Sequence, residues 1–390
     1  MAKAISDNFL QDEYGLTKRA VFGSRSATPE DIELWVGRSH LVDTCAKVLA
    51  KAKHTPKTNF LCFIIGDYGR GKTLSLLKLS EDAKKQGLCP VYLSFKSPTR
   101  VREPGLDTIQ RIFRDFNFNS VTPDKTKIGL LKQVYPDVGS IYDKIFGMSQ
   151  RSLFSGVSLN SEQRLALDFL RGHISPTQKQ LEKLGVICKL DSIEIAKQYL
   201  IGLLYILSSA GFPTIVLAID EFEYVFSIAS KYHRAHYFAL LRELFDLHVS
   251  VPEGIRDKVS NMAIFVAISE FAWIELLDEK KSGGAGSPIN PLLERVSEKI
   301  ILGGLTKKET KQLIEKRLRF NRGKNKYEDK PLIPYTDDFV DYIFTITRGV
   351  PRFIIENCDH VLDKGLEERV PRLNSEFAKQ VLEKRGFKSS

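Results

Sequence analysis

The most informative segment of this 390-residue chain is Gly66-Asp67-Tyr68-Gly69-Arg70-Gly71-Lys72-Thr73. It follows the pattern G-x-x-x-x-G-K-T and lies between an apolar run at residues 61–65 and a helical pattern at residues 74–83. In a strand–loop–helix setting, this pattern is typical of a phosphate-binding P-loop. Glycines let the backbone N–H groups turn toward phosphates, and the following helix N-terminus adds the positive end of its dipole.

The motif gives its side chains distinct roles. We expect Lys72 to reach the β- and γ-phosphates of ATP and the Thr73 hydroxyl to hold Mg²⁺. The alternative, a chance glycine-rich turn, is disfavoured by the flanking patterns. The cofactors expected from this stretch are therefore ATP and Mg²⁺, bound by Gly66, Asp67, Tyr68, Gly69, Arg70, Gly71, Lys72, Thr73 and Leu74.

A second acidic motif follows the apolar run at residues 214–219. Asp220 and Glu221 close this run, which is the Walker B pattern. A carboxylate at such a strand end serves the Mg²⁺ shell, and this role falls to Asp220. The next carboxylate, Glu221, is placed to orient and deprotonate the attacking water. A strand that meets a solvated acidic turn is the alternative; Glu223 is read as a surface residue.

The apolar run at residues 262–268 ends in a polar residue, Ser269. A hydroxyl at this position can contact the γ-phosphate or the water, so Ser269 is a candidate for that role. The alternative is that Ser269 is the N-cap of a following helix, since serine is favoured at that position.

Composition describes a basic protein with enough apolar residues for buried cores. The net charge is +10, and 43% of the residues are hydrophobic against 27% charged. These values exclude wholesale disorder. An excess of positive charge favours anionic partners, of which nucleic acid is the first candidate.

The five cysteines are scattered and form no C-x-x-C pair, which favours buried thiols in a reducing compartment and a cytoplasmic protein. Residues 1–25 lack the apolar core of a signal peptide. Residues 198–219 carry no charge and are long enough to imitate a membrane span. Gly211 and Pro213 interrupt this stretch, so we interpret it as a buried helix followed by a strand, with no membrane partner.

Five short apolar runs alternate with helical patterns, which predicts a parallel sheet covered on both faces. The runs are residues 61–65, 91–95, 214–219, 263–268 and 299–302. About 120 residues separate the second run from the third, too many for an ordinary crossover, and their patterns predict a helical insertion. After Leu305 only helical patterns follow, opened by a capping box at Thr306. We therefore expect an N-terminal arm (1–30), a nucleotide-binding core (31–305) with an insertion near 98–210, and a helical lid (306–390).

From residue 34 onward, these motifs resemble the AAA+ family and, within it, the initiator clade of origin-recognition ATPases. Trp35-Val36-Gly37-Arg38 is similar to the "VGR" element that lies beside the adenine, so the resemblance implies nucleotide contacts from Gly37 and Arg38. A simple turn is the alternative. The implied fold is an α/β P-loop NTPase with a five-stranded parallel sheet, a helical insertion and a C-terminal helical lid.

The resemblance also implies two arginine roles. Arg295 follows Pro291-Leu292-Leu293-Glu294, where the family carries its arginine finger, which acts on ATP of a neighbouring subunit in a homo-oligomer. A salt bridge to Glu294 or Glu298 is the alternative for Arg295. Arg352 ends Thr347-Arg348-Gly349-Val350-Pro351-Arg352, which resembles the sensor-2 motif and implies contact with the γ-phosphate; an ordinary surface arginine is the alternative.

A looser similarity links the chain to ATP-binding proteins of BREX phage-defence operons. It is carried by Phe169-Leu170-Arg171-Gly172, Leu184-Gly185-Val186, the turn at Ala210-Gly211, and Ile219-Asp220-Glu221-Phe222-Glu223. About forty residues follow Arg352, which leaves room for a lid and no winged-helix domain of the kind most initiator ATPases carry. The usual duplex-reading module is therefore not expected, and sequence-specific origin recognition is disfavoured.

Three functions remain open at this point: an ATP-dependent oligomer acting on DNA or a DNA-bound partner, a protein-directed regulatory ATPase, and a nucleotide-binding structural subunit. Tyr232 and Tyr237 are candidates for stacking on unpaired bases. Basic side chains give affinity for phosphates without sequence information, although a solvated charged face is the alternative for each group. The candidate groups are Lys96, Arg100 and Arg102; Lys231, His233 and Arg234; and Arg319, Arg322, Lys324 and Lys326.

Overall fold

The computed structural model describes residues 9–18, 21–22, 27–55, 57–95, 104–146, 159–228, 230–282, 289–322 and 327–384. The chain divides into two compact units that do not follow chain order. The sheet unit comprises Val42–Ile65 and Lys78–Ile300. The lid unit comprises Met1–Leu41, Gly66–Leu77 and Ile301–Ser390. The predicted domain boundaries, which place the P-loop with the sheet, stay a prediction.

A five-stranded sheet in the order β2-β3-β4-β1-β5 forms the centre of the sheet unit. Its strands are β1 (Phe60–Ile65), β2 (Cys89–Ser94), β3 (Thr214–Asp220), β4 (Asn261–Ile268) and β5 (Val296–Ile301). The pairs β1–β4, β2–β3 and β3–β4 are parallel. Every residue of β3 and β4 is buried, because a central parallel strand is covered on both faces.

Helices supply that cover. Helix α2 (Ser39–His54) precedes β1 and α3 (Lys72–Lys85) follows the P-loop. Helix α10 (Ile193–Ser209) packs on β3, and α11 (Lys231–Phe245) contacts β4. The uncharged stretch in the sequence is thus helix α10, which lies among the buried residues of the core, followed by strand β3. None of the helices in the described part of the chain combines the length and apolar character needed to cross a membrane.

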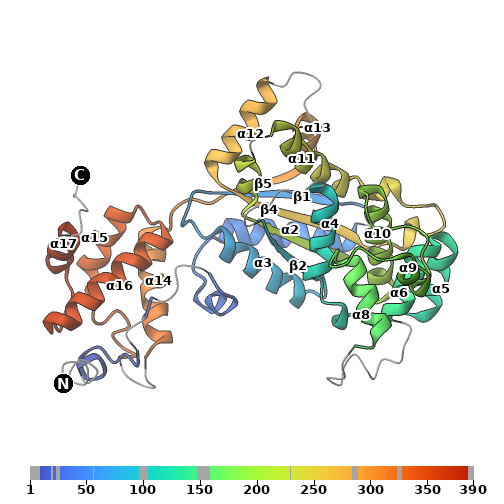
Figure 1. Ribbon diagram of the computed structural model, residues 1–390. Helices are drawn as coiled ribbons and strands as arrows, with labels where there is room; N and C mark the ends of the chain where they lie inside the picture. Colours follow the sequence, from blue (N-terminus) through green and yellow to red (C-terminus); the bar gives the residue numbers. More distant parts are fainter. Residues whose placement is uncertain are drawn as a thin grey trace. The chain divides into compact units, whose positions relative to one another are not determined.

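The predicted insertion is helical. It contains α4 (Pro104–Asp115), α5 (Lys125–Val134), α6 (Pro136–Phe146), α8 (Ser161–Leu170) and α9 (Gln178–Leu184), and it ends with α10. Helices α5, α6, α8 and α9 gather in one teal and green cluster beside the sheet (Figure 1). Helix α4 packs on β2 and α11, so the first helix of the insertion adjoins the edge of the sheet. The apolar faces of these helices join the same hydrophobic core as the strands.

The lid unit has a separate hydrophobic core. Its helices are α14 (Lys307–Phe320), α15 (Asp337–Thr347), α16 (Pro351–Glu368) and α17 (Ser375–Glu383), preceded near the N-terminus by the 3₁₀ helix η1 (Pro29–Leu34). The predicted capping box is present: Thr306 and Glu309 exchange side-chain-to-backbone hydrogen bonds at the start of α14. Buried Arg317 on α14 joins the N-terminal segment to this core, because its guanidinium donates to Phe22 O at 2.6 Å and pairs with Asp31 at 3.2 Å.

The predicted fold class is confirmed, since the five-stranded sheet and the helical C-terminal region agree with the expectation. One detail of the sequence interpretation is wrong. Cys45, Cys62, Cys89 and Cys358 are buried as expected, but Cys188 is exposed on the segment that follows α9. A scattered-cysteine pattern carries no information about which side of a loop faces solvent.

Candidate nucleotide-binding site

The P-loop begins where β1 ends and runs into α3, as the strand–loop–helix pattern requires. Gly69 has φ +80° and Gly71 has φ +88°, in the left-handed region that side chains rarely adopt. Nothing lies within 4 Å of the position that a β-carbon on Gly71 would occupy. The Lys72 Nζ atom folds back over the loop and donates to Gly66 O at 2.8 Å. The glycines therefore give the loop a concave backbone conformation of the kind that binds phosphate oxygens.

The N-terminus of the lid helix α16 lies directly against this loop. The Arg352 backbone N–H donates to Gly69 O at 3.3 Å, and the Arg352 guanidinium carbon lies 4.3 Å from the centroid of the Tyr68 ring. A β-carbon on Gly69 would come within 2.8 Å of the β-carbon of Arg352. The sequence-predicted lid arginine is thus brought to the P-loop, with glycine at the point of closest approach.

The predicted "VGR" segment also reaches the P-loop. The Arg38 guanidinium donates to Arg70 O, and the Arg38 backbone N–H donates to Glu309 Oε1 at 3.3 Å. Gly37 has φ +67°, and a β-carbon there would overlap the Glu309 carboxylate. Burial lowers the pKa of Arg38 to about 10, with the Glu309 carboxylate opposing that effect. Gly37 and Arg38 therefore form more than a simple turn, because they join the start of α14 to the phosphate loop.

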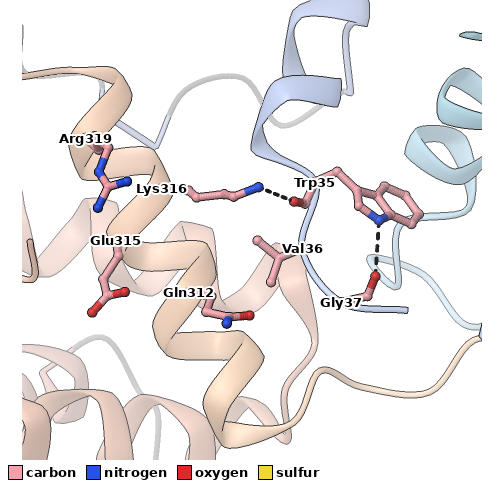
Figure 2. A pocket seen from close by; sticks show the side chains of 7 residues that line it. All are labelled: Trp35, Val36, Gly37, Gln312, Glu315, Lys316 and Arg319. Carbon is pink, nitrogen blue, oxygen red and sulfur yellow. Dashed lines mark hydrogen bonds between the residues drawn. The ribbon is translucent and has the colours of Figure 1, made fainter. Parts of the chain in front are cut away.

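A pocket of about 390 Å³, here called the α14 pocket, opens between this segment and one face of α14 (Figure 2). Lys316 Nζ donates to Trp35 O at 2.7 Å, and Trp35 Nε1 donates to Gly37 O at 3.1 Å. Figure 2 shows Val36 and the Trp35 carbonyl facing the side chains of α14, whereas the Trp35 indole points away from that helix. Its lining residues are Trp35, Val36, Gly37, Gln312, Glu315, Lys316 and Arg319.

The Walker B carboxylates lie at the carboxyl end of β3 in the sheet unit. Asp220 is buried, with 2% of its surface exposed. Its Oδ2 accepts from Tyr92 Oη at 2.7 Å, and its Oδ1 accepts from the Glu221 backbone N–H at 2.9 Å. Glu221 has φ +58°, an uncommon conformation for a residue other than glycine, and its Oε2 accepts from Ser94 Oγ at 2.8 Å. Both carboxylates are therefore held by donors.

Tyr92 and Ser94 were missed in the sequence, although the neighbouring strand β2 carries both. They alternate on β2, and the register pairs Ser94 with Asp220. Burial and the nearby Asp220 carboxylate raise the pKa of Tyr92. Arg111 of α4 donates to Ser94 O at 3.2 Å, which links the insertion to the end of β2. The i, i+2 spacing of two hydroxyls next to a predicted strand end is the signal that would have found them.

The register places the ends of β1 and β3 at the same edge of the sheet. Ile65 pairs with Ile268, and Ile219 pairs with Val266. Because both strands are parallel to β4, their carboxyl ends lie within two residues of each other along that strand. The edge of the sheet where ligands bind in open α/β folds is thus the one from which the P-loop departs.

Two further predicted site residues already have protein partners. Ser269 is a helix cap: its Oγ accepts from the Ala272 backbone N–H at 3.1 Å at the start of α12 (Glu270–Ser282). Arg295 follows α13 (Ile289–Glu294) and pairs with Asp246, with Nε 2.8 Å from Oδ2. This hydrogen bond raises the pKa of Arg295. The partner of Arg295 is Asp246, and neither Glu294 nor Glu298 takes that role.

The residues predicted to bind nucleic acid differ in their exposure and in their partners. Tyr232 is 70% exposed, but Tyr237 is buried, so the prediction that Tyr237 stacks on bases is wrong. Arg234 pairs with Glu279 at 2.9 Å, and Arg322 donates to Ile333 O. Tyr237 is part of the core because it lies on the face of α11 that packs against the sheet. Five candidates lie outside the described residues: Lys96, Arg100, Arg102, Lys324 and Lys326.

The residues present fit ATP and Mg²⁺. The loop has left-handed glycines and a lysine that lies over it, and Thr73 stands in the first turn of α3. Asp220 and Glu221 are acceptor-only groups of the kind Mg²⁺ and its water shell require. Within the described residues, no cluster of three His, Cys, Asp or Glu side chains forms a separate metal site.

Known proteins agree with this architecture. The Aeropyrum pernix ORC2 protein, in its ADPNP–ADP complexes, superposes with a TM-score of 0.52 at 15% identity over 94% of this chain and 72% of that chain. Its ADP form gives a TM-score of 0.51 at 16% identity over 95% and 73%. The chain has the AAA+ P-loop ATPase fold. Identities this low establish a shared AAA+ fold and leave the substrate open.

A sequence family matches the middle of the chain. Residues 156–255 match the family described as BREX system ATP-binding protein BrxC/D. The matched region runs from the insertion through β3 with Asp220 and Glu221 to the segment after α11. None of the curated proteins is a detectable sequence relative. The predicted resemblance to initiator AAA+ proteins and to BREX ATP-binding proteins is therefore confirmed.

Proposed function

We propose that this chain binds and hydrolyses ATP with Mg²⁺ and works as an AAA+ switch. The observation that carries the proposal is the P-loop, which has left-handed Gly69 and Gly71, a lysine over the loop and a lid arginine at its side. Left-handed glycines also occur in structural turns, so the proposal depends on their combination with Lys72 and the helix N-terminus that follows. The surrounding AAA+ fold supports the same reaction class.

In this proposal the two ends of the nucleotide meet different parts of the lid unit. The phosphates lie on the P-loop, where Lys72 and the α3 N-terminus meet their charge. The base would occupy the α14 pocket, which is lined by Gly37, the residue before the Arg38 that donates a hydrogen bond to the loop. Arg352 supplies positive charge for the γ-phosphate. Because ADP lacks this phosphate, the contact would favour ATP.

Hydrolysis is assigned to the carboxylates of the sheet unit. Thr73 and Asp220 would hold Mg²⁺, which neutralises phosphate charge when it is bound. Glu221 accepts a proton from the attacking water, and Ser94 fixes the orientation of its carboxylate. Ser269 stays a candidate for a γ-phosphate or water contact, with the cap of α12 as its established role.

We further propose a homo-oligomer in which Arg295 acts on the ATP of a neighbouring subunit. Its Nε and Nη1 atoms are held by Asp246 and by Pro291 O at 2.8 Å. With 29% of its side chain exposed, Arg295 is a fixed guanidinium at the protein surface. A pre-oriented arginine loses little freedom when it meets phosphate oxygens.

The proposed target is DNA or a DNA-bound partner, in a role of the replication, transposition or phage-defence type. The net charge of +10 and exposed Tyr232 support a nucleic-acid partner, and the match to a BREX family supports phage defence. A protein-directed regulatory ATPase is the second candidate, favoured by the large helical insertion.

The deciding experiments are nucleotide binding, turnover and DNA binding by the same preparation. We expect binding of an ATP analogue in the micromolar range and slow Mg²⁺-dependent phosphate release. A gel shift on single- and double-stranded DNA should appear with ATP and weaken with ADP. Absence of nucleotide binding would overturn the whole proposal, whereas turnover without any DNA shift would favour the protein-directed alternative.

A further inference from the structure

Tyr68 is an aromatic residue inside the P-loop, and 65% of its surface is exposed. An aromatic side chain that takes no part in a core loses the stabilisation that burial gives. In the lid unit this ring has one defined neighbour of opposite electrostatic character: the Arg352 guanidinium, with its carbon 4.3 Å from the ring centroid. A guanidinium over the face of a tyrosine is attracted by the negative ring face.

The arginine is restrained from two further directions. Its backbone N–H, in the first turn of α16, donates to Gly69 O at 3.3 Å, so the helix start is fixed on the loop. Its Nε lies 3.1 Å from Glu356 Oε1, one turn further along α16. The Tyr68 ring and Glu356 together select one orientation of a long side chain that otherwise samples many.

The terminal nitrogens of Arg352 keep their hydrogen-bonding capacity. Among the residues that the structure describes, its side chain contacts Glu356 through Nε and Tyr68 through the guanidinium plane. The stacking contact uses a face of the guanidinium, and the ion pair uses Nε. The forked edge that binds phosphate oxygens in two parallel hydrogen bonds therefore stays available.

We propose that Tyr68 is a positioning residue, whose ring holds Arg352 over the P-loop so that its forked edge meets the γ-phosphate of ATP. This inference rests on the proposed function, because it assigns a γ-phosphate to the site. It adds a specific consequence: Tyr68 improves the affinity for ATP over ADP, and it does so only through Arg352.

The test uses the full chain and compares a non-hydrolysable ATP analogue with ADP by isothermal titration or a fluorescent nucleotide. Tyr68→Phe keeps the ring face, and Tyr68→Leu removes it while it keeps an apolar side chain. Arg352→Gln removes the charge, and the double variant combines both changes. Phe271→Leu is the matched control, since it removes another exposed aromatic ring, on helix α12. Thermal melting of each variant checks folding.

We expect Tyr68→Phe to bind both nucleotides within about twofold of the unmodified chain. Tyr68→Leu should weaken binding of the ATP analogue about fivefold and leave ADP binding within about twofold. Arg352→Gln should weaken the analogue by at least as much, and the double variant should be no weaker than Arg352→Gln alone.

Three results would overturn the inference. The first is full analogue affinity in Tyr68→Leu when Arg352→Gln has lost it. The second is an equal loss of analogue and ADP in Tyr68→Leu, which indicates a damaged loop. The third is additive losses in the double variant. If the unmodified chain binds neither nucleotide, the proposed function itself fails, and that outcome is separate from these three.

Discussion

The Walker B carboxylates and the P-loop are held in place in opposite ways. Asp220 and Glu221 receive hydrogen bonds from Tyr92 and Ser94, two side chains of the adjacent strand. The P-loop instead meets segments far away in the sequence: Arg38, Leu302 and Arg352 each contribute a hydrogen bond to it or from it. The carboxylates are thus a property of the sheet, whereas the shape of the loop is tied to the lid.

This difference has a physical basis. Parallel strands fix their neighbours by a register of backbone hydrogen bonds, so two residues paired across strands stay opposite each other. A glycine-rich loop has many accessible conformations and depends on outside contacts for one of them. We therefore expect changes in the sheet unit to alter catalysis, and changes at the loop and lid to alter nucleotide affinity and stability.

The largest effect should separate hydrolysis from binding. Glu221→Gln keeps the acceptor for Ser94 but removes the base, so the rate of ATP hydrolysis should fall by about 10²–10⁴-fold while ATP affinity stays within threefold. Steady-state phosphate release and equilibrium titration measure the two quantities. Replacement of the nearby Glu223 by Gln is a comparison in the same turn. An unchanged hydrolysis rate in Glu221→Gln would show that this carboxylate is not the base.

A comparable loss of binding is expected on the loop side. Lys72→Ala removes the charge that meets the phosphates, and affinity for ATP should fall by about 100-fold. Lys78→Ala on the same helix is the matched control, because Lys78 pairs with Asp82 and takes no part in the loop. Isothermal titration gives both affinities. Equal ATP binding by the two variants would contradict the assignment of Lys72.

A smaller effect tests whether strand β2 orients the base. Ser94→Ala removes the donor to Glu221, and we expect the hydrolysis rate to fall about fivefold with unchanged ATP affinity. Ser227→Ala is the control, since the Ser227 hydroxyl donates to Tyr224 O and stays outside this contact. A change in affinity without a change in rate would place Ser94 with the nucleotide-binding residues rather than with the base.

The smallest effect concerns the contact between loop and lid. Gly69→Ala meets both an unfavourable φ of +80° and the Arg352 side chain at 2.8 Å. Gly87→Ala meets a similar φ of +74° with nothing within 4 Å. In both variants the strained backbone should lower the free energy of unfolding by about 1 kcal/mol. In Gly69→Ala the overlap with Arg352 should lower it by about 1 kcal/mol more. Thermal or urea unfolding measures the difference; equal losses would mean that the lid does not constrain Gly69.

Much of the fold follows from local patterns in the sequence. The apolar runs predict all five strands to within a few residues. The central strands β3 and β4 are the clearest, because both of their faces are buried, whereas the mostly exposed β5 begins three residues before its predicted run. The lid helices and the Thr306 capping box are equally local features. The residues of the P-loop and of the Walker B motif are recognisable because their chemistry requires adjacent positions in the chain.

Contacts between distant segments could not be predicted in this way. Arg295 pairs with Asp246, 49 positions away, and the Tyr68 ring contacts Arg352, 284 positions away. The hydroxyls of Tyr92 and Ser94 reach the two acids only because β2 lies beside β3, and the strand order is a property of the folded sheet. The burial of Tyr237 likewise depends on which face of α11 meets the core.

Short stretches of neighbouring residues specify the strand–loop–helix pattern, the glycines and lysine of the phosphate loop, and the two acids at the end of an apolar strand. These features are set within a few neighbouring residues, where covalent geometry and side-chain chemistry suffice. The folded arrangement was needed to show which side chains hold those acids and that the Tyr68 ring lies against Arg352. Those choices depend on strand order and helix packing, where many residues far apart in the chain must find one mutual arrangement.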